Sequence, residues 1–181
     1  MMSTINTFMN VKNYWANNWK ANTAQYQWSF QYLIDSIDPQ ERILDIGCGH
    51  SPLKQYFPNL YGIDPYIETG ADEIVGWDDY EPAQEFDRYF VLGSLNFGTQ
   101  ADIERQVEKL SCTVKPGQTV HWRQNPFGND HPWEGSDIVP FYAWSLDKNI
   151  DLCYKYGFKL EKWIYDHGKK TDRHYVEWIK Q

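Results

Sequence analysis

Two glycines and an acidic residue stand close together where the chain leaves a short apolar run. Asp45 lies within residues 43–46, and Gly47, Cys48 and Gly49 follow directly. Such a run of β-favouring residues predicts a strand buried on both faces of a parallel sheet. Because glycine takes positive φ and lets the backbone approach a ligand closely, the pattern favours a ligand-binding turn at the end of this strand.

A helix is expected directly after this turn. Ser51 has the residue type of a helix N-cap, and Pro52 suits the first helical position, so we predict a helix over residues 51–57. A strand, glycine turn and helix direct N–H groups and the positive helix end at one spot. Carboxylate, hydroxyl or phosphate groups of a nucleotide-like ligand can bind there.

A second acidic residue follows the glycine turn at a spacing that fits the same binding site. Asp64 ends a predicted strand over residues 59–63 and comes 17 residues after Gly47, with Pro65 next to it. A carboxylate at this place would accept hydrogen bonds from both ribose hydroxyls of a bound adenosine. We therefore expect the glycine turn and Asp64 to bind one adenosyl group.

The pattern Asp45-x-Gly47-x-Gly49 resembles the first motif of the class I S-adenosylmethionine (SAM)-dependent methyltransferases, acidic-x-Gly-x-Gly-x-Gly. Ser51 stands where the third glycine is usual. The dinucleotide fingerprint of oxidoreductases fits less well, because its third glycine falls on Pro52. The alternative interpretation is a tight turn between a strand and a helix in another kind of α/β domain.

The resemblance implies an α/β fold: a Rossmann-like doubly wound, mostly parallel seven-stranded sheet with an antiparallel C-terminal hairpin. We expect a single domain over residues 1–181, with an N-terminal arm and helix over 1–38 and a core over 39–181. The periodicity agrees with this order. The predicted helices span residues 26–37, 99–114 and 147–156, and the further strands span residues 73–80, 86–98, 119–123, 159–165 and 174–179.

The resemblance also implies where SAM would bind. An acidic residue just past the third strand would contact adenine, and an apolar neighbour would cover its ring. Trp77, Asp78 and Asp79 are the candidates, with no choice between the two aspartates. Gly93 and Ser94, at the end of the fourth strand, would line the cleft. The full predicted cofactor set is Asp45, Gly47, Cys48, Gly49, Asp64, Pro65, Trp77, Asp78, Asp79, Gly93 and Ser94.

The acceptor side is less well defined by the sequence. Residues 124–145 form a long loop rich in proline, glycine and aromatic residues, which is typical of a functional loop. Asn125 and His131 are its candidates for a positioning group or a base. A small molecule or a peptide is the expected acceptor. The acidic and histidine residues of this loop match no metal-ligand spacing, so we expect no metal. Tyr14, Trp15 or Trp19 in the arm could help to shape the acceptor pocket, or could simply be buried.

Composition limits the other classes of function. The net charge of -8 and the pI of about 5.0 weigh against a nucleic-acid partner. Three cysteines without a C-x-x-C pair, and no run as long as a membrane span, indicate a soluble cytoplasmic protein. Nine tryptophans leave one alternative from another class, a non-catalytic binding or scaffold module of the same fold with an aromatic interaction surface.

Overall fold

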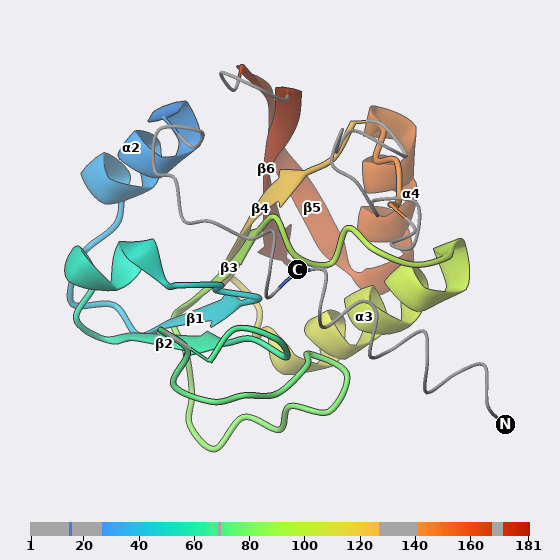
Figure 1. The fold of residues 1–181 in the computed structure, drawn as a ribbon. Helices are drawn as coiled ribbons and strands as arrows, with labels where there is room; N and C mark the ends of the chain where they lie inside the picture. Colours follow the sequence, from blue (N-terminus) through green and yellow to red (C-terminus); the bar gives the residue numbers. More distant parts are fainter. Residues whose placement is uncertain (1–14, 16–26, 69, 127–140, 168–171) are drawn as a thin grey trace, which may run out of the picture.

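A computed structural model describes residues 15, 27–68, 70–126, 141–167 and 172–181 (Figure 1). In this part of the chain, the strands form a six-stranded sheet in the order β2-β1-β3-β4-β6-β5. The strands are β1 (Ile43–Ile46), β2 (Leu60–Ile63), β3 (Arg88–Leu92), β4 (Thr119–Gln124), β5 (Phe158–His167) and β6 (Asp172–Lys180). The helices are α2 (Gln27–Ser36), the 3-10 helix η2 (Pro52–Gln55), α3 (Gln100–Thr113) and α4 (Leu146–Tyr156).

The pairing of the strands confirms the predicted mixed sheet. β1 pairs with β2 and β3 in parallel, and β3 pairs with β4 in parallel. β6 then runs antiparallel to both β4 and β5, which makes the C-terminal hairpin. Because the parallel strands share one direction, their carboxyl ends meet at the same edge of the sheet.

The expected third strand over residues 73–80 was wrong, and the described sheet has six strands rather than seven. Glu73 makes a single parallel bridge with Ile63, and the N–H groups of Asp72 and Glu73 donate to the Gly62 carbonyl at 2.8 and 3.3 Å. The chain then turns, since Asp79 N donates to Gly76 O at 3.0 Å. Glycine and aspartate are poor strand residues, so the pairing along the edge of β2 does not continue.

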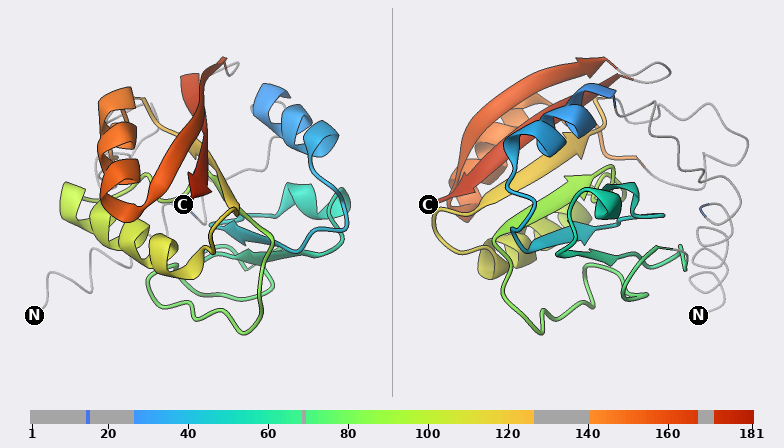
Figure 2. Two further views of the ribbon diagram at one scale, coloured as in Figure 1. Left: turned by 180° about the vertical axis from the view of Figure 1, so that it is seen from behind. Right: turned by 90° about the vertical axis from the view of Figure 1, so that its left-hand side faces the viewer.

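Helices cover both faces of the sheet, as the doubly wound prediction requires (Figure 2). Ile43 and Phe90 pack with α2 and η2, whereas their neighbours Leu44 and Val91 pack with α3 and α4. This alternation follows from the two-residue period of a strand. No helix in the described ranges is long and apolar enough to cross a membrane.

Local signals explain where the longer helices begin and end. Thr99 and Asp102 form the predicted capping box of α3, and Gly157 ends α4 in the left-handed region at φ 69°. The predicted helix over residues 51–57 was largely wrong, because only the single 3-10 turn of η2 forms. Ser51 has φ 48° and makes no capping hydrogen bond, so its predicted N-cap role was also wrong.

Candidate functional site

The carboxyl ends of β1 and β2 bring the glycine turn and Asp64 together. Gly49 N donates to Asp64 Oδ2 at 3.0 Å. The two positions belong to neighbouring parallel strands, so they lie at the same edge of the sheet. The edge that the sequence predicted for ligand binding therefore carries both residues.

The amides of the turn are not available to a ligand as expected. Gly47 N and Cys48 N both donate to the Ile63 carbonyl, at 2.8 and 3.0 Å, and Gly49 N is taken by Asp64. The single turn of η2 also provides no helix N-terminus of useful length. The expectation of free N–H groups was therefore wrong, because these groups fasten the turn to the end of β2.

Asp64 is fixed by three backbone donors. Besides Gly49, Tyr66 N and Ile67 N each donate to Asp64 Oδ1 at 2.8 Å. A carboxylate accepts about four hydrogen bonds, so these contacts leave room for about one more donor. The geometry therefore favours one ribose hydroxyl at this residue rather than the predicted two.

Asp45 is a buried acid that accepts no hydrogen bond from the described residues. It is 4% exposed, and no described residue donates to its carboxyl group. Burial, with the nearby charge of Asp64, raises the pKa of Asp45 to about 7. Such a carboxyl group is poised to lose its proton when a cation approaches.

Cys48 and Ser51 complete the turn. The Cys48 sulfur lies so close to Gly62 that a Cβ there would approach it to 2.7 Å, and burial raises the pKa of the thiol, so it stays protonated. The Ser51 hydroxyl is buried and has no hydrogen-bond partner. This hydroxyl was not among the predicted binding groups, although its place at the third-glycine position was a usable signal in the sequence.

The end of β3 provides space next to the turn. A Cβ on Gly47 would lie 2.3 Å from Ser94 Cβ, so glycine is required at this contact. Ser94 Oγ donates to the Ile46 carbonyl. Gly93 has φ 110°, and a Cβ built on it would meet no atom within 4 Å. Open space therefore borders the β3 end beside the two glycines of the turn.

The structure separates the candidates for the adenine contact. Trp77 is buried in the core, and its indole N–H donates to Gln106 O at 3.0 Å, which gives it a packing role. The Asp78 carboxylate pairs with Arg105 at 3.2 Å, whereas the Asp79 carboxylate makes no hydrogen bond or ion pair with the described residues. A Cβ on Gly76, one residue before Trp77, would lie 3.7 Å from Pro65 Cβ. The turn that carries both aspartates thus adjoins the end of β2.

On the acceptor side, Asn125 directly follows β4. Its side chain is 2% exposed, and its Nδ2 has no hydrogen-bond partner. His131, the other candidate, lies outside the described residues. His121 lies in the middle of β4, between Arg88 Nη1 at 3.0 Å and Tyr175 OH at 2.7 Å, and burial lowers its pKa well below the usual value. A neutral, enclosed histidine in that position is a packing group.

A buried ion pair near the same edge was missed by the sequence analysis. Arg123 Nε donates to Asp166 Oδ2 at 2.8 Å, and Ser29 Oγ of α2 donates to the same oxygen at 2.7 Å. The residues come from three distant segments, so the sequence contains no spacing that could have revealed them.

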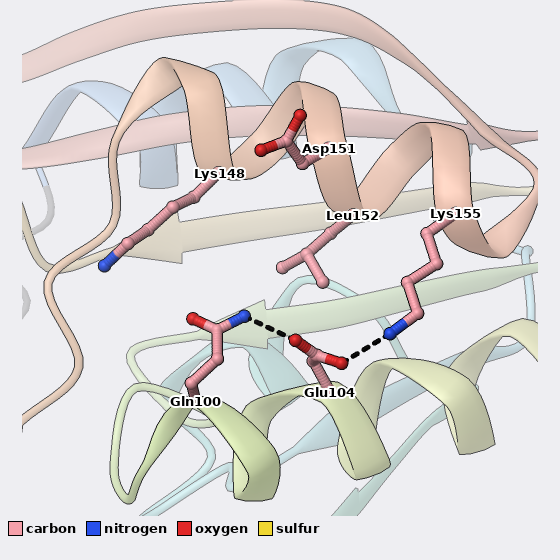
Figure 3. Close-up of a pocket in the computed structure, with 6 residues that line it drawn as sticks. All are labelled: Gln100, Glu104, Lys148, Asp151, Leu152 and Lys155. Atoms are coloured by element: carbon pink, nitrogen blue, oxygen red, sulfur yellow. Dashed lines mark hydrogen bonds and ion pairs between the residues drawn. The ribbon is translucent and has the colours of Figure 1, made fainter.

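A groove of about 230 Å³ lies elsewhere, between α3 and α4 (Figure 3). Glu104 of α3 accepts from Gln100 at 2.7 Å and pairs with Lys155 of α4. Gln100, Glu104 and Lys155 of this groove thus already pair with one another. No group of three or more potential metal ligands stands together in the described ranges.

No protein-family model and no curated protein matches the sequence. Solved structures do match. Magnesium protoporphyrin IX methyltransferase (ChlM) from Synechocystis PCC 6803, with bound SAM, has a TM-score of 0.68 and 12% identity over 97% of each chain. A second match is 1,6-didemethyltoxoflavin-N1-methyltransferase from Burkholderia thailandensis, with bound 1,6-didemethyltoxoflavin and S-adenosylhomocysteine (SAH). Its TM-score is 0.70, with 11% identity over 99% of this chain and 86% of that one.

The chain has the fold of the class I SAM-dependent methyltransferases. N-methyltransferase NodS from Bradyrhizobium japonicum WM9, in complex with SAH, is similar to the same extent. Its TM-score is 0.69, with 14% identity over 97% of this chain and 98% of that one. At such identities the likeness establishes this methyltransferase fold, and the residues at the carboxyl edge carry the argument for function.

Proposed function

We propose that the chain is a SAM-dependent methyltransferase with a small-molecule or peptide acceptor. One observation carries the proposal: the glycine turn, Asp64 and the open space at Gly93 lie at one edge of a methyltransferase-fold sheet. The similar structures support it, because they contain SAM or SAH, and two are named for porphyrin and toxoflavin substrates.

The residues at this edge fit the parts of SAM. The remaining acceptor position of Asp64 suits a ribose hydroxyl. Asp45, buried and without a donor, suits the ammonium of the methionine portion, and the open space at Gly93 suits its carbon chain. Cys48, with its thiol turned to Gly62, contributes only backbone to this surface.

Methyl transfer requires little covalent chemistry from the protein. Bound SAM supplies a methyl group on a positively charged sulfur, which passes to a lone pair of the acceptor while the electrons of the broken bond stay on sulfur. The chain must position the acceptor in line with that bond and exclude water. Asn125 is placed for positioning, and a role of His131 as base stays a prediction.

For adenine we assign the hydrogen bond to Asp79 rather than Asp78. The Asp78 carboxylate already pairs with Arg105, whereas Asp79 has no such contact among the described residues. We expect Asp79→Asn to weaken SAH binding about tenfold, and Asp78→Asn to leave it within about twofold. Equal effects of the two variants in calorimetric titration would contradict this assignment.

Calorimetric titration of the full chain with SAH tests the proposed function. We expect saturable binding at micromolar SAH and no heat with NADH, because Pro52 stands where the dinucleotide motif needs its third glycine. A folded sample that gives no heat with SAH would overturn the proposal.

The burial of the rings disfavours the alternative of a scaffold with an aromatic surface. Of the seven tryptophans that the structure describes, only Trp28 is exposed, and Trp77, Trp122, Trp144 and Trp178 are buried. These rings serve the core, so they do not form a broad interaction patch.

A further inference from the structure

Three aromatic rings meet beyond the carboxyl ends of β3 and β4. Phe97 and Phe141 form an isolated antiparallel bridge, and their ring centroids are 5.0 Å apart at an interplanar angle of 71°. The ring of Trp15 lies 5.0 Å from that of Phe97 at 61°. We call Trp15, Phe97 and Phe141 the ring cluster. It joins the N-terminal arm, the end of β3 and the segment that leads into α4.

Backbone hydrogen bonds place Asn125 beside this ring cluster. Asn125 N donates to Asn96 Oδ1 at 3.5 Å, and Asn125 O accepts from Trp144 N at 2.8 Å. Asn96 O in turn accepts from Tyr142 N at 2.7 Å. Asn125 is therefore tied both to Asn96, the residue before Phe97, and to Trp144, which follows Phe141 closely in the chain.

The amide of Asn125 is one of several buried polar groups in this region that have no hydrogen-bond partner among the described residues, together with the indole N–H groups of Trp122 and Trp144. The Asn125 side chain is 2% exposed, yet Nδ2 donates to nothing. Buried donors are almost always paired in native proteins, so an unpaired one calls for an explanation. At the carboxyl edge, beside the proposed SAM site, a bound acceptor provides that explanation.

Resting on the proposed function, we propose that the methyl acceptor is a planar aromatic or heteroaromatic small molecule. Its ring packs against the ring cluster, and a carbonyl, ring nitrogen or hydroxyl oxygen on that ring accepts the hydrogen bond from Asn125 Nδ2. Aromatic faces and edges favour other rings over saturated chains of equal size, and the single amide donor fixes the orientation.

The charges at this edge favour a neutral acceptor over a cationic peptide side chain. On the β4 side, the Asp166 carboxylate is held at 2.8 Å by Arg123. Asp45 and Asp64 belong to the cofactor side of the edge. The Asp166 carboxylate is therefore already compensated and would not be available to a lysine or arginine acceptor.

The test uses the full chain saturated with SAH and ligand-observed NMR. The probes are bicyclic lactams and phenols such as 2-quinolone, each paired with its ring-saturated counterpart, and a lysine-containing peptide. We expect planar probes to bind about tenfold more tightly than their saturated counterparts, and the peptide not to bind. With SAM in place of SAH, mass spectrometry should detect methylated product among the planar probes that carry a nucleophilic oxygen or nitrogen.

Two variants assign the effect to these residues. Asn125→Asp keeps the shape but replaces the donor with an acceptor, and Phe97→Leu keeps an apolar side chain but removes the ring. Each should weaken binding of the planar probes about tenfold while SAH affinity stays within about twofold. If Asn125→Asp does not fold, the effect of Phe97→Leu on binding of the planar probes is the test.

Three outcomes overturn the inference. They are equal binding of planar and saturated probes, binding that neither variant changes, and preference for the peptide. Failure of SAH itself to bind would instead overturn the proposed function, so the two failures are distinguishable.

Discussion

Asp45 is a carboxyl group at the candidate site whose ionisation departs strongly from its ordinary behaviour. It lies in β1 and is 4% exposed, and burial with the charge of Asp64 raises its pKa to about 7. The protonated form therefore persists in the folded protein at pH values where the unfolded chain has lost this proton.

We predict that replacing Asp45 changes the pH dependence of stability. Between about pH 4 and pH 7 the unfolded chain binds fewer protons at this residue than the folded chain, so its contribution to stability falls as pH rises. The pKa difference corresponds to about 4 kcal/mol at most. Asp45→Asn should not lose stability in this way, so its free energy of unfolding should equal or exceed that of the parent protein above pH 7. Urea unfolding at several pH values measures the stability of both proteins. Parallel pH profiles of the parent and the variant would refute the prediction.

The same residue should make cofactor binding pH-dependent. An ammonium group beside Asp45 favours the charged carboxylate and lowers its pKa, so SAH binding near pH 7 releases a proton. Affinity should rise between pH 6 and pH 8 in the parent and stay flat in Asp45→Asn. Calorimetry in buffers of different ionisation enthalpy counts the proton directly. A parent protein that releases no proton would place the ammonium elsewhere.

Gly93 and Gly117 form a matched pair for testing the open space at the β3 end. Both have positive φ, 110° and 84°, and a Cβ on either would meet no atom within 4 Å. Alanine strains the backbone in both places, so both variants lose similar stability. We expect only Gly93→Ala to weaken SAH binding, by about tenfold. Equal SAH affinities in calorimetry would show that the space at Gly93 is not used.

At the scale of elements, α2 is attached to the sheet by polar groups as well as by its apolar face. Ser29 Oγ donates to Asp166, and Tyr32 OH accepts from Lys162, which also pairs with Glu177 at 3.1 Å. Tyr175 OH donates to Glu177 at 2.9 Å. These contacts fix the position of α2 over β5 and β6, close to the proposed acceptor side.

We predict that the buried ion pair below α2 matters far more for stability than an exposed pair of similar geometry. Asp166 and Arg123 are nearly inaccessible, whereas Arg42 and Asp87 are about half exposed. Asp166→Asn removes one charge of a buried pair and should lower the free energy of unfolding by about 3 kcal/mol. Asp87→Asn should change it little, because water screens the exposed pair. Chemical denaturation of both variants compares them, and similar losses would contradict the ranking.

At the scale of the whole molecule, ligand binding should appear as added stability. SAH at a hundredfold excess over its Kd stabilises the folded state by about 2.7 kcal/mol. For a chain of 181 residues this corresponds to a rise in Tm of about 5 to 10 °C. Differential scanning calorimetry with SAH, and with NADH as the control, measures the rise. An unchanged Tm with SAH would mean that the folded chain does not bind SAH.

Much of this fold was determined by signals within short stretches of sequence. The apolar run before Gly47, the capping box at Thr99 and the glycine after α4 each act through neighbours in the chain, so the position of β1 and these helix ends could be predicted. The predicted third strand failed for a local reason as well, since Gly76 and the aspartates that follow it favour a turn.

Only the tertiary structure decided how the site residues are occupied. The sequence placed Asp64 opposite the glycine turn, but it could not reveal that three backbone N–H groups already use the carboxylate. Nor could it reveal that Arg123 forms an ion pair with Asp166, or that the Asn125 amide N–H has no hydrogen-bond partner. Such pairings depend on which distant segments the fold brings together. Residue types and spacing therefore predicted where a ligand should bind, and packing determined which polar groups remain to bind it.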